Sequence, residues 1–297
     1  MLCKDDVKFS MIAVFGGLLL IILYAAILLL TLPLKTEIFL KFLSIGLALF
    51  LIKKISKRDV LIVNLLLTTY ILVTFEYGFL HKNWGELAIV ISYFAMSRVG
   101  QFSVAGLVAI TGYLLRSRST QAIGFIFLFP VNPIRLFWTT IIGYHATLAT
   151  LGFFFLDGIH LVGASASNLG RSTLIANVIG GVPDYPFGYF TYEEYQASVE
   201  NNVLKVFNED KYTDPHSFIA SSIAWLGPVV TIILLRLLHT TFVRYQVASE
   251  KQKFMVVSIA VYLCTATMSL ANTIFLLWCF TGYFYEYRKC RSYSRQL

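Results

Sequence analysis

The chain alternates long apolar runs with short polar gaps, and this pattern predicts a bundle of membrane-crossing helices. A membrane-spanning helix needs about 20 predominantly apolar residues. Runs that meet or approach this length lie at 9–32, 36–52, 59–75, 99–115, 134–157 and 217–238. The stretch 254–285 is long enough for two short spans, with a break near Ser269. The pattern therefore predicts an all-α polytopic membrane protein with about eight to ten spans and one long external loop containing short helices.

Two shorter apolar stretches, 86–97 and 121–130, leave the topology open. Because they are short for ordinary spans, we expect them to form half-helices or interfacial pieces. On that interpretation Arg98 lies outside, on the same side as the polar segment 158–215. If both stretches cross instead, 158–215 stays outside, but Arg98 moves to the cytoplasmic side and the basic gap 116–118 faces outward, against the positive-inside rule. We therefore favour the first topology.

Composition and charge indicate that lipid solvates this chain. Hydrophobic residues make up 57% of the 297 residues and charged residues only 13%, compared with about 25% charged residues in a typical soluble domain. The formal net charge is +8, but the basic residues gather in short gaps, a distribution typical of cytoplasmic loops. This clustering argues against nucleic-acid binding. The basic gaps are Lys53–Arg58, Arg116–Arg118, Arg236–Lys253 and Arg288–Arg295.

Residues 158–215 form the one long hydrophilic segment of an otherwise single membrane domain, and we expect them to carry the functional site. Loops of this length are uncommon in compact proteins and are often functional. Asn168 is a candidate N-cap for an external helix over 171–179, which Gly180 and Gly181 would end. The loop is rich in aromatic residues. These could stack on sugar rings or anchor the loop at the membrane interface, and the sequence leaves both interpretations open.

Three polar residues are candidates for chemistry. Arg171 would lie in the first turn of the external helix, and Arg98 ends an apolar run, where charge is costly and often functional. His216 lies where the loop meets the span beginning at Phe218, and a histidine there can act as a general base because its ordinary pKa is close to working pH. Each also has a structural interpretation, since solvated or snorkelling arginines and interfacial histidines are common.

Together these residues resemble the motifs of the family of O-antigen ligases and O-antigen polymerases. The similarity covers roughly residues 90–240 and lies in the order of four short motifs and their placement around the external loop. These are Ser97-Arg98-Val99-Gly100, Gly170-Arg171, Pro186-Phe187-Gly188 and Asp214-Pro215-His216-Ser217. The chain departs from the family in having Ser217 where asparagine is usual, and in having fewer spans before the first arginine motif.

The resemblance implies a metal-independent, inverting glycosyltransferase without a cofactor. Arg98 and Arg171 would bind the diphosphate of an undecaprenyl-diphosphate-linked oligosaccharide. His216 would take the proton from the hydroxyl of a glycan acceptor, with Asp214 or Ser217 orienting its ring. The chain is then expected to be a multi-pass protein of the bacterial inner membrane with its active site on the periplasmic face. It would polymerise O-antigen or similar repeat units, and it could act with a chain-length regulator.

Two other functions stay open at the level of sequence. An O-antigen ligase would use the same donor but transfer the glycan to the lipid A core, and no residue separates a ligase from a polymerase. A flippase for lipid-linked oligosaccharides belongs to another class of protein. Such carriers generally show internal repeats and polar residues near mid-membrane, whereas the spans of this chain are largely free of charge at their centres.

Overall fold

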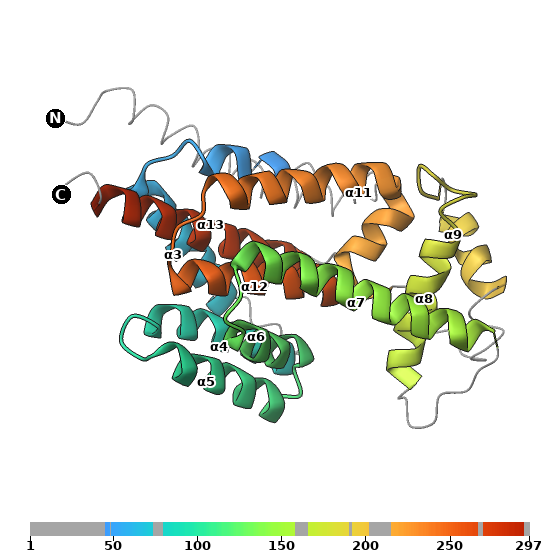
Figure 1. The fold of residues 1–297 in the computed structure, drawn as a ribbon, viewed down its shortest axis with the longest axis horizontal. Coiled ribbons are helices and arrows are strands. Elements are labelled where there is room, and N and C mark those ends of the chain that lie inside the picture. The colour runs from blue at the N-terminus through green and yellow to red at the C-terminus, as the bar shows by residue number, and fades with distance from the viewer. Residues whose placement is uncertain are drawn as a thin grey trace.

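In a computed structural model, the chain forms a bundle of antiparallel helices with two further helices, α8 and α9 (Tyr192–Val199), at one end (Figure 1). The structure describes residues 45–47, 49–73, 80–157, 166–189, 192–201, 215–266 and 270–293, so the expected first span at 9–32 lies outside this part. The described residues form helices and no strand, which confirms the all-α fold class.

Most of the predicted spans correspond to helices of the bundle. The matching helices are α3 (Lys57–Val73), α5 (Gln101–Leu114), α7 (Pro133–Leu156) and α11 (Phe218–Arg244). The stretch 254–285 divides as expected, into α12 (Glu250–Thr265) and α13 (Leu270–Tyr293). Among the described helices, α7 and α11 are long and apolar enough to cross a membrane.

Local sequence signals determine where α7 and α11 begin. The Asn132 side chain accepts a hydrogen bond from the N–H of Ile134 at 2.8 Å. Pro133 occupies the first helical position, where its missing N–H breaks no helical hydrogen bond. At the start of α11 the Ser217 hydroxyl accepts a hydrogen bond from the N–H of Ala220 at 3.2 Å. Both caps satisfy backbone donors that a helix N-terminus otherwise leaves unpaired.

A turn that follows α8 packs against a kink in α11. Gly227 lies at the kink with a φ of +79° and is followed by a proline. A Cβ on Gly227 would lie 2.6 Å from the carbonyl oxygen of Pro186, and a Cβ on Gly188, which has a φ of +77°, would lie 2.7 Å from the carbonyl oxygen of Ala224. The Tyr189 N–H donates to that same oxygen at 2.7 Å. Both positions therefore need glycine, for conformation and for space.

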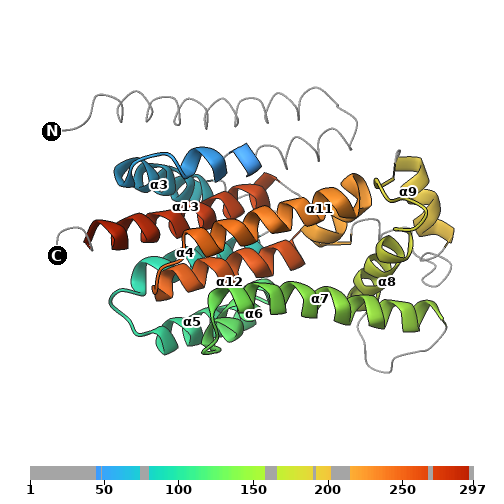
Figure 2. The same cartoon turned by 45° about the horizontal axis from the view of Figure 1, so that its top comes forward.

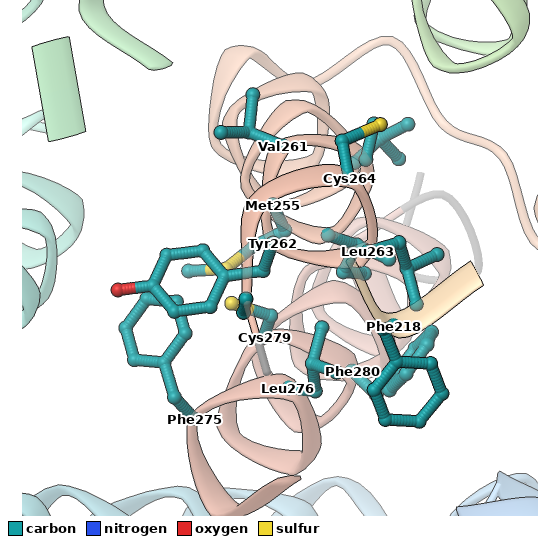
Figure 3. Close-up of a cluster of buried hydrophobic side chains, with 14 of the residues drawn as sticks. Phe218, Met255, Val261, Tyr262, Leu263, Cys264, Phe275, Leu276, Cys279 and Phe280 are labelled. Atoms are coloured by element: carbon teal, nitrogen blue, oxygen red, sulfur yellow. The ribbon is translucent and has the colours of Figure 1, made fainter. Parts of the chain in front are cut away.

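The core of the bundle surrounds α12, whose side chains are buried along nearly its whole length. Figure 3 shows Val261, Tyr262 and Cys264 leaving this helix in different directions. The rings of Tyr262 and Phe275 lie 4.2 Å apart between centroids. A helix that is enclosed on all sides needs no polar face, which explains the uninterrupted apolar run in its sequence.

The two stretches whose topology was open both form helices that traverse the bundle. α4 (Leu80–Ala95) and α6 (Arg118–Leu128) each pack against α5, which connects them in the chain. α4 begins before its apolar run, at Leu80, and contains the buried Glu86, whose carboxylate accepts a hydrogen bond from the Tyr262 hydroxyl at 3.1 Å. Arg98 and the gap 116–118 lie at the ends that the alternative arrangement predicts. α6, with 11 residues, has the length of a half-helix, and the crossing of a membrane by α4 and α6 stays a prediction.

The bundle has two chemically different ends; Figure 1 and Figure 2 show α8 and α9 at one of them and the C-terminal end of α13 at the other. We define the basic end as residues 53–58, 96–101, 129–135, 244–253 and 286–293. There Lys253 Nζ donates to the carbonyl oxygen of Phe129 at 2.8 Å, and Arg288 donates to that of Lys53. The opposite end, next to α8 (Ala166–Gly180), is called the α8 end. There α6 meets the end of α12, with the Ser119 hydroxyl 2.7 Å from that of Thr265.

Candidate functional site

α8 packs closely against α7 and carries Arg171 in its second turn. A Cβ on Gly152 of α7 would lie 2.7 Å from the Cβ of Ala176, so only glycine permits this approach. The helix begins at Ala166 and already includes Asn168. Asn168 is therefore not the N-cap, and the expected position of Arg171 in the first turn is wrong, because the helix starts earlier than the polar cap signal indicated. The end of the helix at Gly180 agrees with the expectation.

A cavity of about 710 Å³ runs between α6, α7, α8 and α12, from Phe129 and Val131 at the basic end to Arg118 and Arg171 at the α8 end. Arg118 and Arg171 are the charged residues in its wall, which is otherwise mainly apolar. The apolar lining includes Ala122, Ile126, Leu148, Leu151, Leu169 and Val261. The cavity thus combines a surface suited to a hydrocarbon chain with two fixed positive charges.

The guanidinium of Arg171 is incompletely satisfied within the part of the chain that the structure describes. Its Nε is buried and has no hydrogen-bond partner there. The Tyr144 side chain, also in the cavity wall, lies close enough to both Arg171 and Arg118 to interact with them electrostatically. Leaving a buried donor unpaired costs about 1–3 kcal/mol, and more for a charged group. A ligand with several anionic oxygens would remove this cost by accepting hydrogen bonds from both arginines.

Arg98 lies at the basic end, far from Arg171. It is exposed in the connection between α4 and α5, and the neighbouring Gln101 Nε2 donates to the carbonyl oxygen of Phe127 at 3.5 Å. α12, with 16 residues, runs from the basic end to the α8 end, so Arg98 and Arg171 are roughly 20 Å or more apart. The structure therefore does not bring Arg98 into the cavity wall with Arg171, and the role of Arg98 in binding a diphosphate stays a prediction from the sequence. The second arginine in the cavity wall, beside Arg171, is Arg118.

The Pro-His-Ser motif lies at the α8 end, beside α7. Ser217 is buried, and its hydroxyl lies 2.8 Å from Nε2 of His145, whose Nδ1 lies 2.8 Å from the carbonyl oxygen of Ile141. With Nδ1 donating to Ile141, Nε2 accepts the Ser217 proton. Ser217 therefore links α7 to the start of α11, with its proton directed to His145. The sequence did not single out His145, and no local signal could have done so, because its partner is 72 residues away.

His216 has a left-handed backbone, with a φ of +47°. A residue with a Cβ rarely adopts this conformation, and such strain is concentrated at functional sites. His216 is partly exposed and precedes the buried Ser217, so its backbone is anchored at the α8 end although it does not line the cavity itself. Asp214 lies outside the described residues. The structure thus brings His216 and Arg171 to the same end of the bundle.

Comparisons with family models, curated proteins and solved structures find no match to this chain. The similarity to O-antigen polymerases and ligases therefore rests on the sequence motifs alone. Among the described residues, no group of three His, Cys, Asp or Glu side chains is arranged to hold a metal ion. The arginine-lined cavity is the arrangement that points to a ligand.

Proposed function

We propose that this chain is a membrane-embedded glycosyltransferase whose donor is a glycan linked to a polyprenyl diphosphate. The supporting observation is the cavity at the α8 end, where an apolar wall meets Arg118 and Arg171 and the buried Nε of Arg171 needs an acceptor. A guanidinium binds phosphate through two parallel hydrogen bonds and keeps its charge at any physiological pH. The apolar wall can therefore hold the part of the lipid chain next to the diphosphate, and the two arginines can hold the diphosphate itself.

The exposed surface supports a location within a membrane. Large apolar side chains remain open on several helices, among them Phe102 at 77% and Leu114 at 71% exposure on α5, and Ile232 at 62% on α11. Soluble proteins rarely expose such apolar surface over wide areas. Lysine and arginine are more numerous at the basic end than at the α8 end, where Arg116 and Arg118 lie, and by the positive-inside rule we take the basic end as cytoplasmic. The α8 end, with its cavity, would face the periplasm of a bacterial inner membrane.

Diphosphate is the leaving group in the proposed reaction, so negative charge develops on it as the glycosidic bond breaks. Arg118 and Arg171 would stabilise that charge, which lowers the barrier if both are already in place. His216 would accept the proton from the attacking hydroxyl, and attack opposite the diphosphate would invert the anomeric centre. The acceptor in this proposal is a second lipid-linked repeat unit, as in the O-antigen polymerases that the motifs resemble.

Glycan transfer by the purified chain in detergent tests the proposal. With an undecaprenyl-diphosphate-linked repeat unit as donor and acceptor, we expect products longer than one repeat. Arg118→Gln and Arg171→Gln should each lower the rate on the order of 10²-fold, and His216→Ala on the order of 10²–10⁴-fold. Arg116→Gln is the matched control, since Arg116 is exposed at the same end but lies outside the cavity wall. It should keep a rate close to that of the unmodified chain.

Three outcomes would change the interpretation. If the folded chain transfers no glycan but moves the lipid across a vesicle membrane, it is a carrier and not an enzyme. If transfer occurs only to a lipid A core, the chain is a ligase. If Arg98→Gln is as damaging as Arg171→Gln at equal expression, the assignment of Arg118 in place of Arg98 is wrong.

A further inference from the structure

The basic end contains a second cavity, of about 650 Å³, whose wall carries five cationic side chains. Three separate elements form it: the segment before α3, the C-terminal end of α11 and the C-terminal end of α13. The lining residues are Lys53, Lys57, Arg244, Arg288 and Arg291, together with Tyr245, Tyr287 and Ser292. Among the described residues, no carboxylate contributes to the wall.

The cations in this cavity are held close to one another. Lys53 Nζ and the guanidinium carbon of Arg244 each lie 5.8 Å from the centroid of the Tyr245 ring. Arg288 donates a hydrogen bond to the carbonyl oxygen of Lys53. Burial, together with the charge of Arg244, lowers the pKa of Lys53. Repulsion between these like charges raises the energy of the cavity, and an anion bound between them would lower it.

A general bias of positive charge toward the cytoplasm does not require this arrangement. That bias is met by solvated residues such as Lys54 and Arg58, which are exposed and do not line the cavity. The nearby Asp59 interacts with Arg288, but its carboxylate accepts hydrogen bonds from Ser56 and it is not part of the wall. Convergence of cations from three elements on one cavity indicates a binding site.

We propose that this second cavity binds a ligand carrying two or more phosphate groups. The guanidinium forks can each engage a phosphate through paired hydrogen bonds, while the ammonium groups add point charges. Basic cavities between helices on the cytoplasmic side are suited to the headgroups of anionic lipids, and a free diphosphate presents the same chemistry. Occupancy would fasten the ends of α11 and α13 to the segment that leads into α3. The site lies at the opposite end from Arg118 and Arg171 and does not depend on their proposed role.

Two probes test the site and separate its sources of phosphate. They are cardiolipin, a lipid with two phosphates, supplied in neutral detergent micelles, and inorganic pyrophosphate. Binding to the purified full chain is measured by native mass spectrometry and by calorimetric titration. The double substitution Lys53→Gln with Arg288→Gln should weaken binding about 30-fold, since each basic residue near an anionic headgroup contributes about 5-fold. The matched control, Lys54→Gln with Arg58→Gln, removes two charges from outside the wall and should change binding by less than about 2-fold.

A second pair of substitutions distinguishes loss of binding from loss of the fold. Lys57→Gln with Arg291→Gln removes two charges from the wall but keeps the hydrogen bond between Arg288 and Lys53, and it should weaken binding to a similar extent. Binding of cardiolipin that pyrophosphate does not displace identifies a lipid headgroup, and displacement at comparable concentration identifies a free phosphate ligand. Either result supports the site. Failure of both probes to bind, or an equal loss in the control pair, overturns the proposal.

Discussion

The contact between α7 and α8 offers the most direct test of how this fold positions Arg171. In Gly152→Ala the new Cβ would lie 2.0 Å from the carbonyl oxygen of Ser172 and 2.7 Å from the Cβ of Ala176, whereas ordinary contacts begin at 3.4 Å. The two helices must therefore separate by about 1.4 Å at this crossing. Overpacking of this kind costs about 1–3 kcal/mol. Because Arg171 is carried by α8, the same movement would shift its guanidinium, and a displacement near 1 Å can lower a rate by about 10²-fold.

Thermal unfolding in detergent and glycan transfer measure the two consequences separately. Chains of somewhat smaller size lose about 2–4 °C in midpoint temperature for each kcal/mol of destabilisation. A cost of about 1–3 kcal/mol should therefore lower the midpoint temperature of Gly152→Ala by about 2–12 °C. Gly106→Ala is the matched control, because Gly106 lies within α5 and a Cβ there would have nothing within 4 Å. Alanine at such a helical position should raise stability by about 0.5–1 kcal/mol.

The reasoning fails if Gly152→Ala unfolds at the same temperature as the unmodified chain or at a higher one. An unchanged or higher midpoint is expected only of the control, Gly106→Ala. That result would mean that α7 and α8 do not meet as closely as described. If the midpoint falls but glycan transfer is unchanged, the position of Arg171 does not limit the reaction, and the proposed role of the cavity at the α8 end is wrong.

Two further predictions concern buried contacts. Gly227→Ala should destabilise the chain by about 1–3 kcal/mol, because the backbone at Gly227, with a φ of +79° and a ψ of 165°, has a conformation that is essentially open only to glycine. It should also expose the turn at 181–189 to limited proteolysis, because a Cβ would displace the carbonyl of Pro186. Unaltered proteolysis would contradict the packing of that turn on α11. Tyr262→Phe should cost about 1–3 kcal/mol by removing a hydrogen-bond donor from the buried Glu86 carboxylate. A double-mutant cycle with Glu86→Gln should give a coupling energy above about 0.5 kcal/mol, and additive effects would show that the two side chains do not interact.

The sequence alone determined the helical class and the position of most helices. An apolar run has to satisfy its backbone polar groups internally, so long runs predict helices wherever they lie. This is why α3, α5, α7 and α11 match the expected spans within a few residues, except that α11 continues to Arg244. Local signals also predicted a helix end correctly where the residues that cause it are neighbours in the chain, as at Gly180, the last residue of α8. They failed at its start, where Asn168 suggested a cap that the helix does not use.

Only the tertiary structure decided which helix ends lie together. Hydropathy is counted over a local window, and it cannot register that Glu86 is satisfied by Tyr262, 176 residues further along the chain. The structure carries Arg98 to the basic end and brings Arg118 and Arg171 into one cavity wall. Which residues share a site therefore depended on the direction in which each helix runs, because reversing one helix exchanges the end at which every later connection emerges.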